Sequence, residues 1–173
     1  QRSLVGSEMC IRDSVLTRTW PKEREFAPDS SYVFPAKGIL KKLTVEYWFH
    51  KNDVENHPNG NDVFQVKKGR NKIATIAEGD TSGKSFKRLH RWRFSPTAAY
   101  GHNEVHLHPY KERRISVAEA MAIQSLPREF VVLPTLPLSK KFKMIGNAVP
   151  YLMAAAIAKT LMETLNDIRE DNP

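Results

Sequence analysis

The sequence contains very little cysteine and no long uninterrupted apolar run. Its 173 residues include a single cysteine, Cys10, which excludes a disulfide within the chain and makes a cysteine-based zinc site nearly impossible. Cysteine usage this low suits a reducing compartment. The longest apolar segment, near residues 153–162, contains Lys159 and Thr160. It falls short of the roughly 18 consecutive apolar residues of a membrane helix, so we expect no membrane span and no membrane partner.

Positive charge is what the sequence has in excess. It has 27 Lys and Arg residues against 19 Asp and Glu, which gives a formal net charge of +8. Between Lys67 and Arg93, nine basic residues are opposed by only Glu78 and Asp80. A basic surface attracts polyanions such as nucleic acid. A solvated basic face without a ligand is the simpler interpretation of the same pattern.

The first 14 residues differ in character from the rest. Their sequence, QRSLVGSEMCIRDS, does not begin with methionine and is similar to the translated adaptor remnants found in some environmental gene assemblies. We therefore expect residues 1–14 to be a non-native leader, Cys10 to be accidental, and the natural reading frame to be cut upstream. A natural disordered terminus is the alternative.

The clearest helix signals lie in the last third of the chain. Ser116 followed by Glu119 is typical of a capping box, in which each side chain accepts a hydrogen bond from a backbone amide at the start of a helix. We expect this helix to run to about Ser125, with Pro127 ending it. A second helix is expected from about residue 150 to 166, because apolar side chains there recur at helical spacing.

Signals upstream are weaker. Residues 15–37 are polar and proline-containing, which favours loop structure. Residues 40–50 mix β-branched and aromatic side chains and could form a strand or a short helix. Residues 64–67 and 72–76 alternate weakly, as short strands do.

Two blocks in the last third resemble motifs of the DNA (cytosine-5)-methyltransferase family. Residues 114–127, RISVAEAMAIQSLP, are similar to the ninth motif, with Ala122 where the family usually has arginine and Ser125 where it usually has glycine. Residues 146–150, GNAVP, resemble the tenth motif. The 18 intervening residues are typical of the family. The chain therefore resembles a carboxyl-terminal fragment of such an enzyme.

This resemblance implies an α/β fold whose doubly wound S-adenosylmethionine-binding sheet is mostly missing from the chain. The expected remainder is a target-recognition region at residues 15–110, small, irregular and β-rich, followed by two carboxyl-terminal helices at residues 111–173. These helices would return to the missing amino-terminal catalytic domain. The full-length protein is expected to be monomeric and cytoplasmic, in a prokaryote or phage, and part of a restriction-modification system.

The family reaction needs a cysteine nucleophile and a bound cofactor, and the sequence can be searched for residues that serve each. A cysteine thiolate adds to C6 of a cytosine flipped out of double-stranded DNA, and S-adenosylmethionine then methylates C5. No Pro-Cys pair is present in the sequence, so we assign no catalytic residue and expect the fragment alone to be inactive. By resemblance, the tenth motif lies against the methionine part of the cofactor, and a helix amino-terminus would offer free amides to its carboxylate. The cofactor-binding candidates are Gly146, Asn147, Ala148 and Val149.

The basic segment occupies the position of the target-recognition region. Arginine and lysine neutralise phosphates, and arginine commonly reads guanine in the major groove. The DNA-binding candidates are Arg70, Lys87, Arg88, Arg91, Arg93 and Arg114. A contact of Arg114 with phosphate and a purely supporting role for it are equally open.

The remaining candidates have structural interpretations. Ser116, Glu119, Gln124 and Pro127 are expected to shape the ninth-motif helix. His102, His106 and His108 could suggest a metal, but no cysteine or helical HxxxH pattern supports it, so we expect no metal site. Two other functions remain open: a non-catalytic DNA-binding module, and a histidine-metal nuclease.

Overall fold

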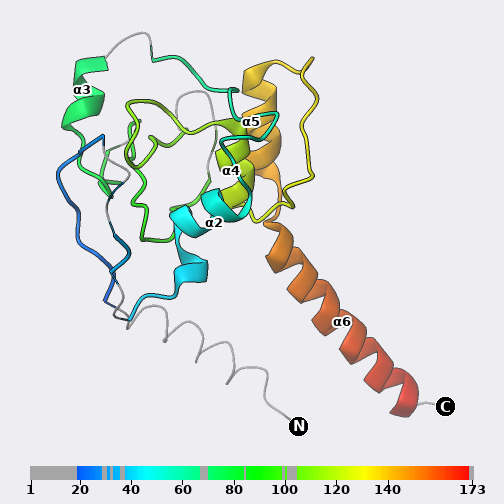
Figure 1. Cartoon of the computed structure of the whole chain (residues 1–173). Coiled ribbons are helices and arrows are strands. Elements are labelled where there is room, and N and C mark those ends of the chain that lie inside the picture. The colour runs from blue at the N-terminus through cyan, green and yellow to red at the C-terminus, as the bar shows by residue number, and fades with distance from the viewer. Residues whose placement is uncertain are drawn as a thin grey trace.

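The computed structural model describes residues 19–28, 31, 33–35, 38–66, 70–83, 85–98, 100 and 105–171. The expected leader at 1–14, with Cys10, and His102 lie outside these residues. The described elements are η1 (Lys41–Leu43), α2 (Val45–Lys51), α3 (Arg70–Thr75), α4 (Val117–Ile123), α5 (Leu138–Asn147) and α6 (Tyr151–Asp171). In Figure 1, α2, α4 and α5 lie together in the body of the molecule, and α6 projects away from it.

Within the described residues there is no extended strand, so the expected β-rich character of the recognition region is not confirmed. Backbone pairing there is limited to isolated bridges such as Val63 with Ser116 and Arg88 with Leu107. The strand expected at residues 72–76 is wrong, because α3 covers most of that segment. Ile73 and Ile76 are both buried. Ile73 lies in α3 and Ile76 directly follows it, and their joint burial with Leu107 in one small cluster outweighs the weak alternation.

The capping box of α4 is confirmed. The Ser116 hydroxyl accepts a hydrogen bond from the backbone amide of Glu119 at 3.1 Å, and the Glu119 carboxylate accepts one from the amide of Ser116 at 2.7 Å. The helix ends at Ile123, two residues before the expected end and well ahead of Pro127.

A helix that the sequence did not lead us to expect, α5, precedes the tenth-motif turn. Its buried apolar side chains, Phe142 and Ile145, are three apart, which is the spacing of one helical face. The prolines at 134 and 137 favoured a loop, and Pro137 instead stands at the N-cap of α5. The chain thus has three carboxyl-terminal helices where two were expected.

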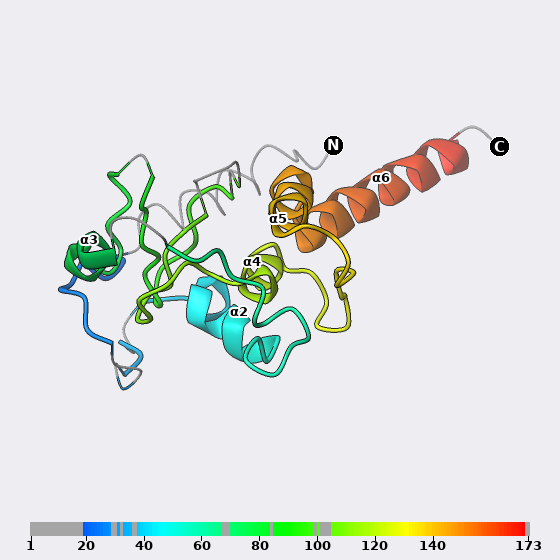
Figure 2. The ribbon, with the colours of Figure 1, turned by 90° about the horizontal axis from the view of Figure 1, so that it is seen from above.

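The core forms where α4 packs between α2 and α5, an arrangement that Figure 2 shows from above. Val45 and Phe49 of α2, Met121 of α4 and Phe142 of α5 belong to one buried cluster. Thr44 caps α2 by accepting a hydrogen bond from the amide of Tyr47 at 3.4 Å. Burial of these faces stabilises short helices that would be marginal in isolation.

Gly146, near the end of α5, lies against the backbone of the 98–100 segment. A Cβ atom there would be 3.0 Å from both the carbonyl oxygen of Ala98 and the amide nitrogen of Tyr100. Glycine at position 146 is therefore needed for packing within the chain itself.

The surface of α6 is strongly apolar. Leu152, Ile157, Leu161, Leu165 and Ile168 are each at least half exposed. The segment Leu138–Arg169, which contains α5 and α6, is also long and apolar enough to cross a membrane by length and composition. This differs from our expectation that no such segment exists. One such segment is weak evidence for a membrane location, and an exposed apolar face is equally typical of a protein contact surface.

Three histidines are buried in the interior. His90, His106 and His108 are each no more than 2% exposed. Desolvation lowers the pKa of His90 and that of His106 to about 4, and it also lowers the pKa of His108. Burial disfavours the charged imidazolium, so these rings are neutral in the folded protein at pH 7.

Replacing Gly146→Ala is expected to destabilise the protein by about 1–3 kcal/mol, because the added methyl meets two backbone atoms that cannot rotate away. Urea unfolding followed by circular dichroism measures the effect. The control Ala158→Ser adds one atom on exposed α6 and should change the unfolding free energy by less than about 0.5 kcal/mol. Equal effects from the two substitutions would contradict the close packing around Gly146.

Acidification from pH 7 to pH 4 is expected to lower the free energy of unfolding. Between pH 6.5 and pH 4 the unfolded chain protonates His90 and His106 while the folded chain does not. Stability is therefore full above pH 6.5 and is lost as pH falls, by up to about 1.4 kcal/mol per pH unit for each histidine. Urea unfolding at half-unit pH steps tests this. His106→Leu should flatten the slope, and an unchanged slope would rule out the contribution of His106.

Candidate cofactor and DNA interface

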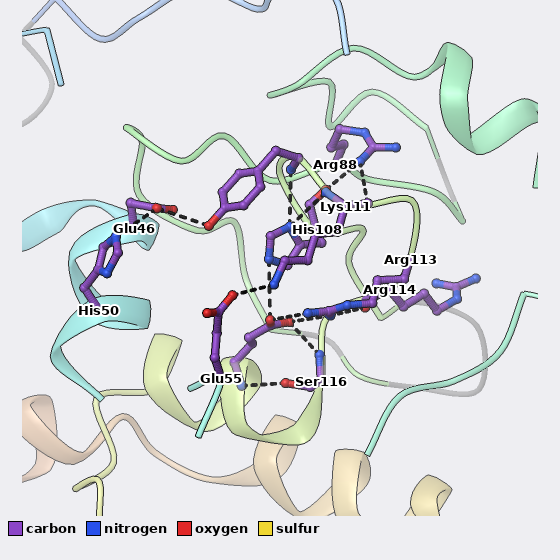
Figure 3. A network of polar contacts seen from close by, with 11 residues as sticks. Glu46, His50, Glu55, Arg88, His108, Lys111, Arg113, Arg114 and Ser116 are labelled. Carbon is purple, nitrogen blue, oxygen red and sulfur yellow. Dashed lines mark hydrogen bonds and ion pairs between the residues drawn. The ribbon is translucent and has the colours of Figure 1, made fainter. Parts of the chain in front are cut away.

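Glu119 is the centre of a buried polar network that joins α4 to the segment before it. Figure 3 shows its partners His108, Arg113 and Ser116. Its two carboxylate oxygens accept hydrogen bonds from the guanidinium of Arg113 at 2.6 and 2.8 Å. Burial would raise the pKa of Glu119, but the hydrogen bonds from Arg113 and His108 outweigh it and hold this pKa well below its usual range. The carboxylate is thus ionised and held in place. Its role is larger than the cap expected from the sequence.

His108 takes part in this network as a neutral ring. Its Nδ1 accepts hydrogen bonds from the amides of Tyr110 and Lys111, at 3.2 and 3.1 Å. Its Nε2 lies 3.4 Å from a carboxylate oxygen of Glu119. Since Nδ1 accepts, Nε2 carries the proton and donates to Glu119. The ring is fully used within the fold, which leaves it unsuited to bind a metal.

The end of α4 holds the turn that follows α5. The Gln124 side-chain amide donates to the carbonyl of Ile145 of α5 at 3.2 Å, so this residue bonds a neighbouring helix in addition to its expected place in the ninth-motif helix. The Gln124 carbonyl accepts from the amide of Tyr151 at 3.0 Å. The Ser125 hydroxyl accepts from the amide of Leu152 at 3.1 Å. Two amides at the start of α6 are therefore engaged, and the expectation that they are free for a cofactor carboxylate is wrong.

The side chains of the turn itself face outward. Asn147, Ala148 and Val149 are all exposed. Gly146 and Ala148 line a hollow of about 600 Å³ together with apolar residues distant in sequence. Trp48 of α2 and the short Phe94–Pro96 stretch form part of its walls. Sequence reasoning missed these wall residues, because nothing in the local pattern shows that they meet the turn.

Three of the basic DNA-binding candidates are buried, and their guanidinium groups are bonded to other groups of the protein. Arg88, which is fully buried, donates to the carbonyls of Ile73, Ile76 and His108 at 2.5 to 2.9 Å. Arg91 pairs with buried Glu78 at 2.9 Å. Arg114, 8% exposed, donates to the carbonyl of Val105. In this conformation their guanidinium groups hold loops together and are not available to DNA phosphates.

The other basic candidates lie differently. Lys87 and Arg93 are partly exposed. The guanidinium of Arg93 donates to the carbonyl of Gly79 at 3.3 Å. Arg70 begins α3, but its side chain lies outside the described part of the chain. Among the five candidates whose side chains are described, Lys87 and Arg93 are the two that are partly exposed.

The histidine and acidic residues suggest no metal centre in the described part of the chain, where no group of three or more potential ligands gathers. His106 stacks edge-on against the ring of Tyr100, with ring centroids 5.5 Å apart. Sequence patterns also gave no sign of the ion pair between buried Lys141 and Asp62, at 2.7 Å, which ties α5 to the turn region before Val63.

Comparison with known proteins supports the resemblance in the ninth and tenth motifs. The C-5 cytosine-specific DNA methylase family matches residues 20–163. Type II methyltransferase M.NmeDI of Neisseria meningitidis serogroup C is 53% identical over 152 residues, which are 88% of this chain and 36% of that protein. No solved structure matches the chain.

A shorter relative is also similar. Type II methyltransferase M.AquIB of Picosynechococcus is 30% identical over 100 residues, which are 53% of this chain and 72% of that protein. The chain therefore spans about a third of the length of its meningococcal relative and most of the length of the other. With the family match covering most of its residues, this chain belongs to the C-5 cytosine-specific DNA methylase family.

Proposed function

We propose that this chain supplies target recognition and one wall of the cofactor pocket to a DNA (cytosine-5)-methyltransferase. The observation that supports this most directly is the end of α5 and the turn after it, where Asn147, Ala148 and Val149 are exposed and Gly146, Ala148 and Pro150 line an apolar hollow. S-adenosylmethionine would supply the methyl group. The chain contributes no nucleophile, since no Pro-Cys pair occurs in its sequence, so catalysis requires protein beyond these residues.

The turn fits the cofactor in a way that differs from the simple helix-terminus picture. With the amides of Tyr151 and Leu152 already bonded, the groups left for contact are the exposed side chains at positions 147–149. The Asn147 amide can both donate and accept hydrogen bonds. Ala148 lines the hollow, and the exposed Val149 next to it in the chain offers a further apolar side chain. We therefore assign cofactor binding to these side chains, with Gly146 as a positioning residue for the turn.

The DNA contact is proposed for the surface that carries Lys87 and Arg93. Both side chains are partly exposed within the most basic segment of the chain. Three buried guanidinium groups stabilise the loops of this region. Arg88 and Arg114 donate to backbone carbonyls, and Arg91 pairs with Glu78. In the proposal the substrate is double-stranded DNA, from which the target cytosine is flipped.

The apolar face of α6 is proposed to pack on the remainder of the methyltransferase. The exposed side chains of Ile157, Leu161, Leu165 and Ile168 repeat three to four residues apart along this one helix. Such a stripe normally faces a partner surface.

The division of the chain at about residue 110 is proposed as a functional one, between target recognition and the return to the catalytic domain. The two sides are also joined within the chain. Lys141 of α5 pairs with Asp62, and Ser116 forms an isolated bridge with Val63. The recognition side is therefore held against the helices that would contact the rest of the enzyme.

Type II methyltransferase names among the relatives also favour a role in a restriction-modification system, acting in the cytoplasm as a monomer. A free-standing DNA-binding module would leave the tenth-motif turn without a use. A histidine-metal nuclease has no supporting site among the described residues.

Binding of the chain to duplex DNA is expected to weaken steeply with salt. Replacing Lys87→Gln should reduce the slope of log K against log salt concentration by about 0.9, the value for one phosphate contact. Fluorescence anisotropy with labelled duplex measures it. The control Lys159→Gln removes a charge from exposed α6 and should leave the slope unchanged. A salt-independent affinity would contradict the proposed DNA contact.

A hybrid enzyme tests the cofactor wall. Residues 20–171 of this chain, placed in M.NmeDI instead of its matching segment, should transfer tritiated methyl groups to cytosine in DNA. Asn147→Ala in the hybrid should weaken S-adenosylmethionine binding about tenfold, the loss of one hydrogen bond to a charged group, with DNA affinity unchanged. The control Asn166→Ala lies far along α6 and should alter neither. Equal losses of cofactor and DNA affinity for Asn147→Ala would argue against its assigned role.

A further inference from the structure

A second, smaller hollow also borders the Phe94–Pro96 stretch. Its volume is about 260 Å³, and its lining includes Trp20, Glu23, Thr81, Arg93 and Phe94. Phe94 and Pro96 line both this hollow and the larger one beside the tenth-motif turn. No residue of the turn itself borders the smaller hollow, so it is distinct from the proposed cofactor wall.

Aromatic rings form one side of the smaller hollow. Trp20 and Phe94 meet edge to face, with ring centroids 5.2 Å apart and planes at 84°. Phe94 is 52% exposed, so part of its ring surface is open to a ligand. A half-exposed ring within a basic segment is the arrangement on which nucleobases stack in proteins that bind single strands.

Arg93 supplies hydrogen-bond donors at the same hollow. Its backbone is held on both sides, since its amide donates to the carbonyl of His90 at 3.2 Å and its carbonyl accepts from the amide of Val45 at 3.0 Å. Among the described residues its guanidinium makes one hydrogen bond, to the Gly79 carbonyl, and an arginine has five N–H donors. The side chain is thus anchored with donors to spare, in contrast to buried Arg88 and Arg91.

Gly79 makes this position of Arg93 possible. Its φ is +93°, which favours glycine. A Cβ atom at residue 79 would lie 2.9 Å from Nη1 of Arg93 and 3.1 Å from Cδ2 of His90. Any larger residue would displace the guanidinium. The local backbone is therefore shaped around Arg93 in the position that it occupies at the hollow.

The size and lining of the hollow restrict what it can hold. Pockets for drug-sized ligands start at about 300 Å³, so the occupant is smaller than these ligands, and the aromatic and proline side chains in the lining suit a small planar ring. An arginine fork matches the paired O6 and N7 acceptors of guanine. We propose that this hollow is a second nucleobase slot, which takes an unstacked base, guanine above others, other than the target cytosine.

This inference rests on the proposed DNA contact and places the base one wall away from the tenth-motif turn. Phe94 and Pro96 would then border both the base and the larger hollow. In this proposal the slot increases DNA affinity by contact with a base, whereas Lys87 increases it by contact with a phosphate.

The binding affinities of two single-stranded oligonucleotides of equal length distinguish the contribution of the bases from that of the phosphates. One is abasic throughout, and the other carries a single guanine at its centre. Stacking is worth about 1–3 kcal/mol per base, so the guanine strand should bind the 173-residue chain about tenfold more tightly. Phe94→Ala should abolish the difference, and Arg93→Gln should reduce it. The control Phe130→Ala removes a ring that is 47% exposed outside the hollow and should preserve it.

The outcomes are distinguishable. Equal binding of the two strands, with normal salt dependence, overturns the slot and leaves the proposed DNA contact standing. A guanine preference that survives Phe94→Ala also overturns the slot. Failure of both strands and of duplex DNA to bind overturns the DNA contact and the slot with it. Melting temperatures of the variants exclude unfolding as the cause of a loss.

Discussion

One buried carboxylate, that of Glu119, joins the parts of this structure that carry its proposed function. It accepts hydrogen bonds from the start of its own helix, from Arg113, and from His108. A buried charge is stable only when fully paired, so these three partners must be in position together. The ninth-motif helix and the 108–113 segment are consequently fixed relative to each other, and the loops with Arg88 attach to that segment through the carbonyl of His108.

Much of the positive charge in the basic segment has a structural use. Arg88, Arg91 and Arg114 replace the backbone pairing that strands would provide, because a guanidinium can bond several acceptors from different loops. This explains how a region with only isolated bridges in its described part keeps a defined shape. It also shows why a count of basic residues overstates the surface available to DNA.

The sequence was informative where the physics is local. The capping box of Ser116 and Glu119, and the helices over α4 and α6, follow from spacing within a few residues. The family followed from two motifs. Other features depended on contacts between distant segments: α5, the helix at Arg70–Thr75, the burial of Arg88 and Arg91, and the wall formed by Trp48 and Phe94. No local pattern reports whether a basic side chain meets a carbonyl from another loop or faces water.

Ser125 stands where the family usually has glycine, and its φ of 55° shows why glycine is usual at this position. A left-handed conformation costs a non-glycine residue about 1–2 kcal/mol, which here is offset by the hydrogen bond from the amide of Leu152 to the Ser125 hydroxyl. Together with Gln124, this residue makes the end of α4 a rigid bracket for the start of α6. Because Gln124 also bonds the carbonyl of Ile145, the end of α5 and the start of α6 are fixed to the same point, and any movement of α4 would displace both together.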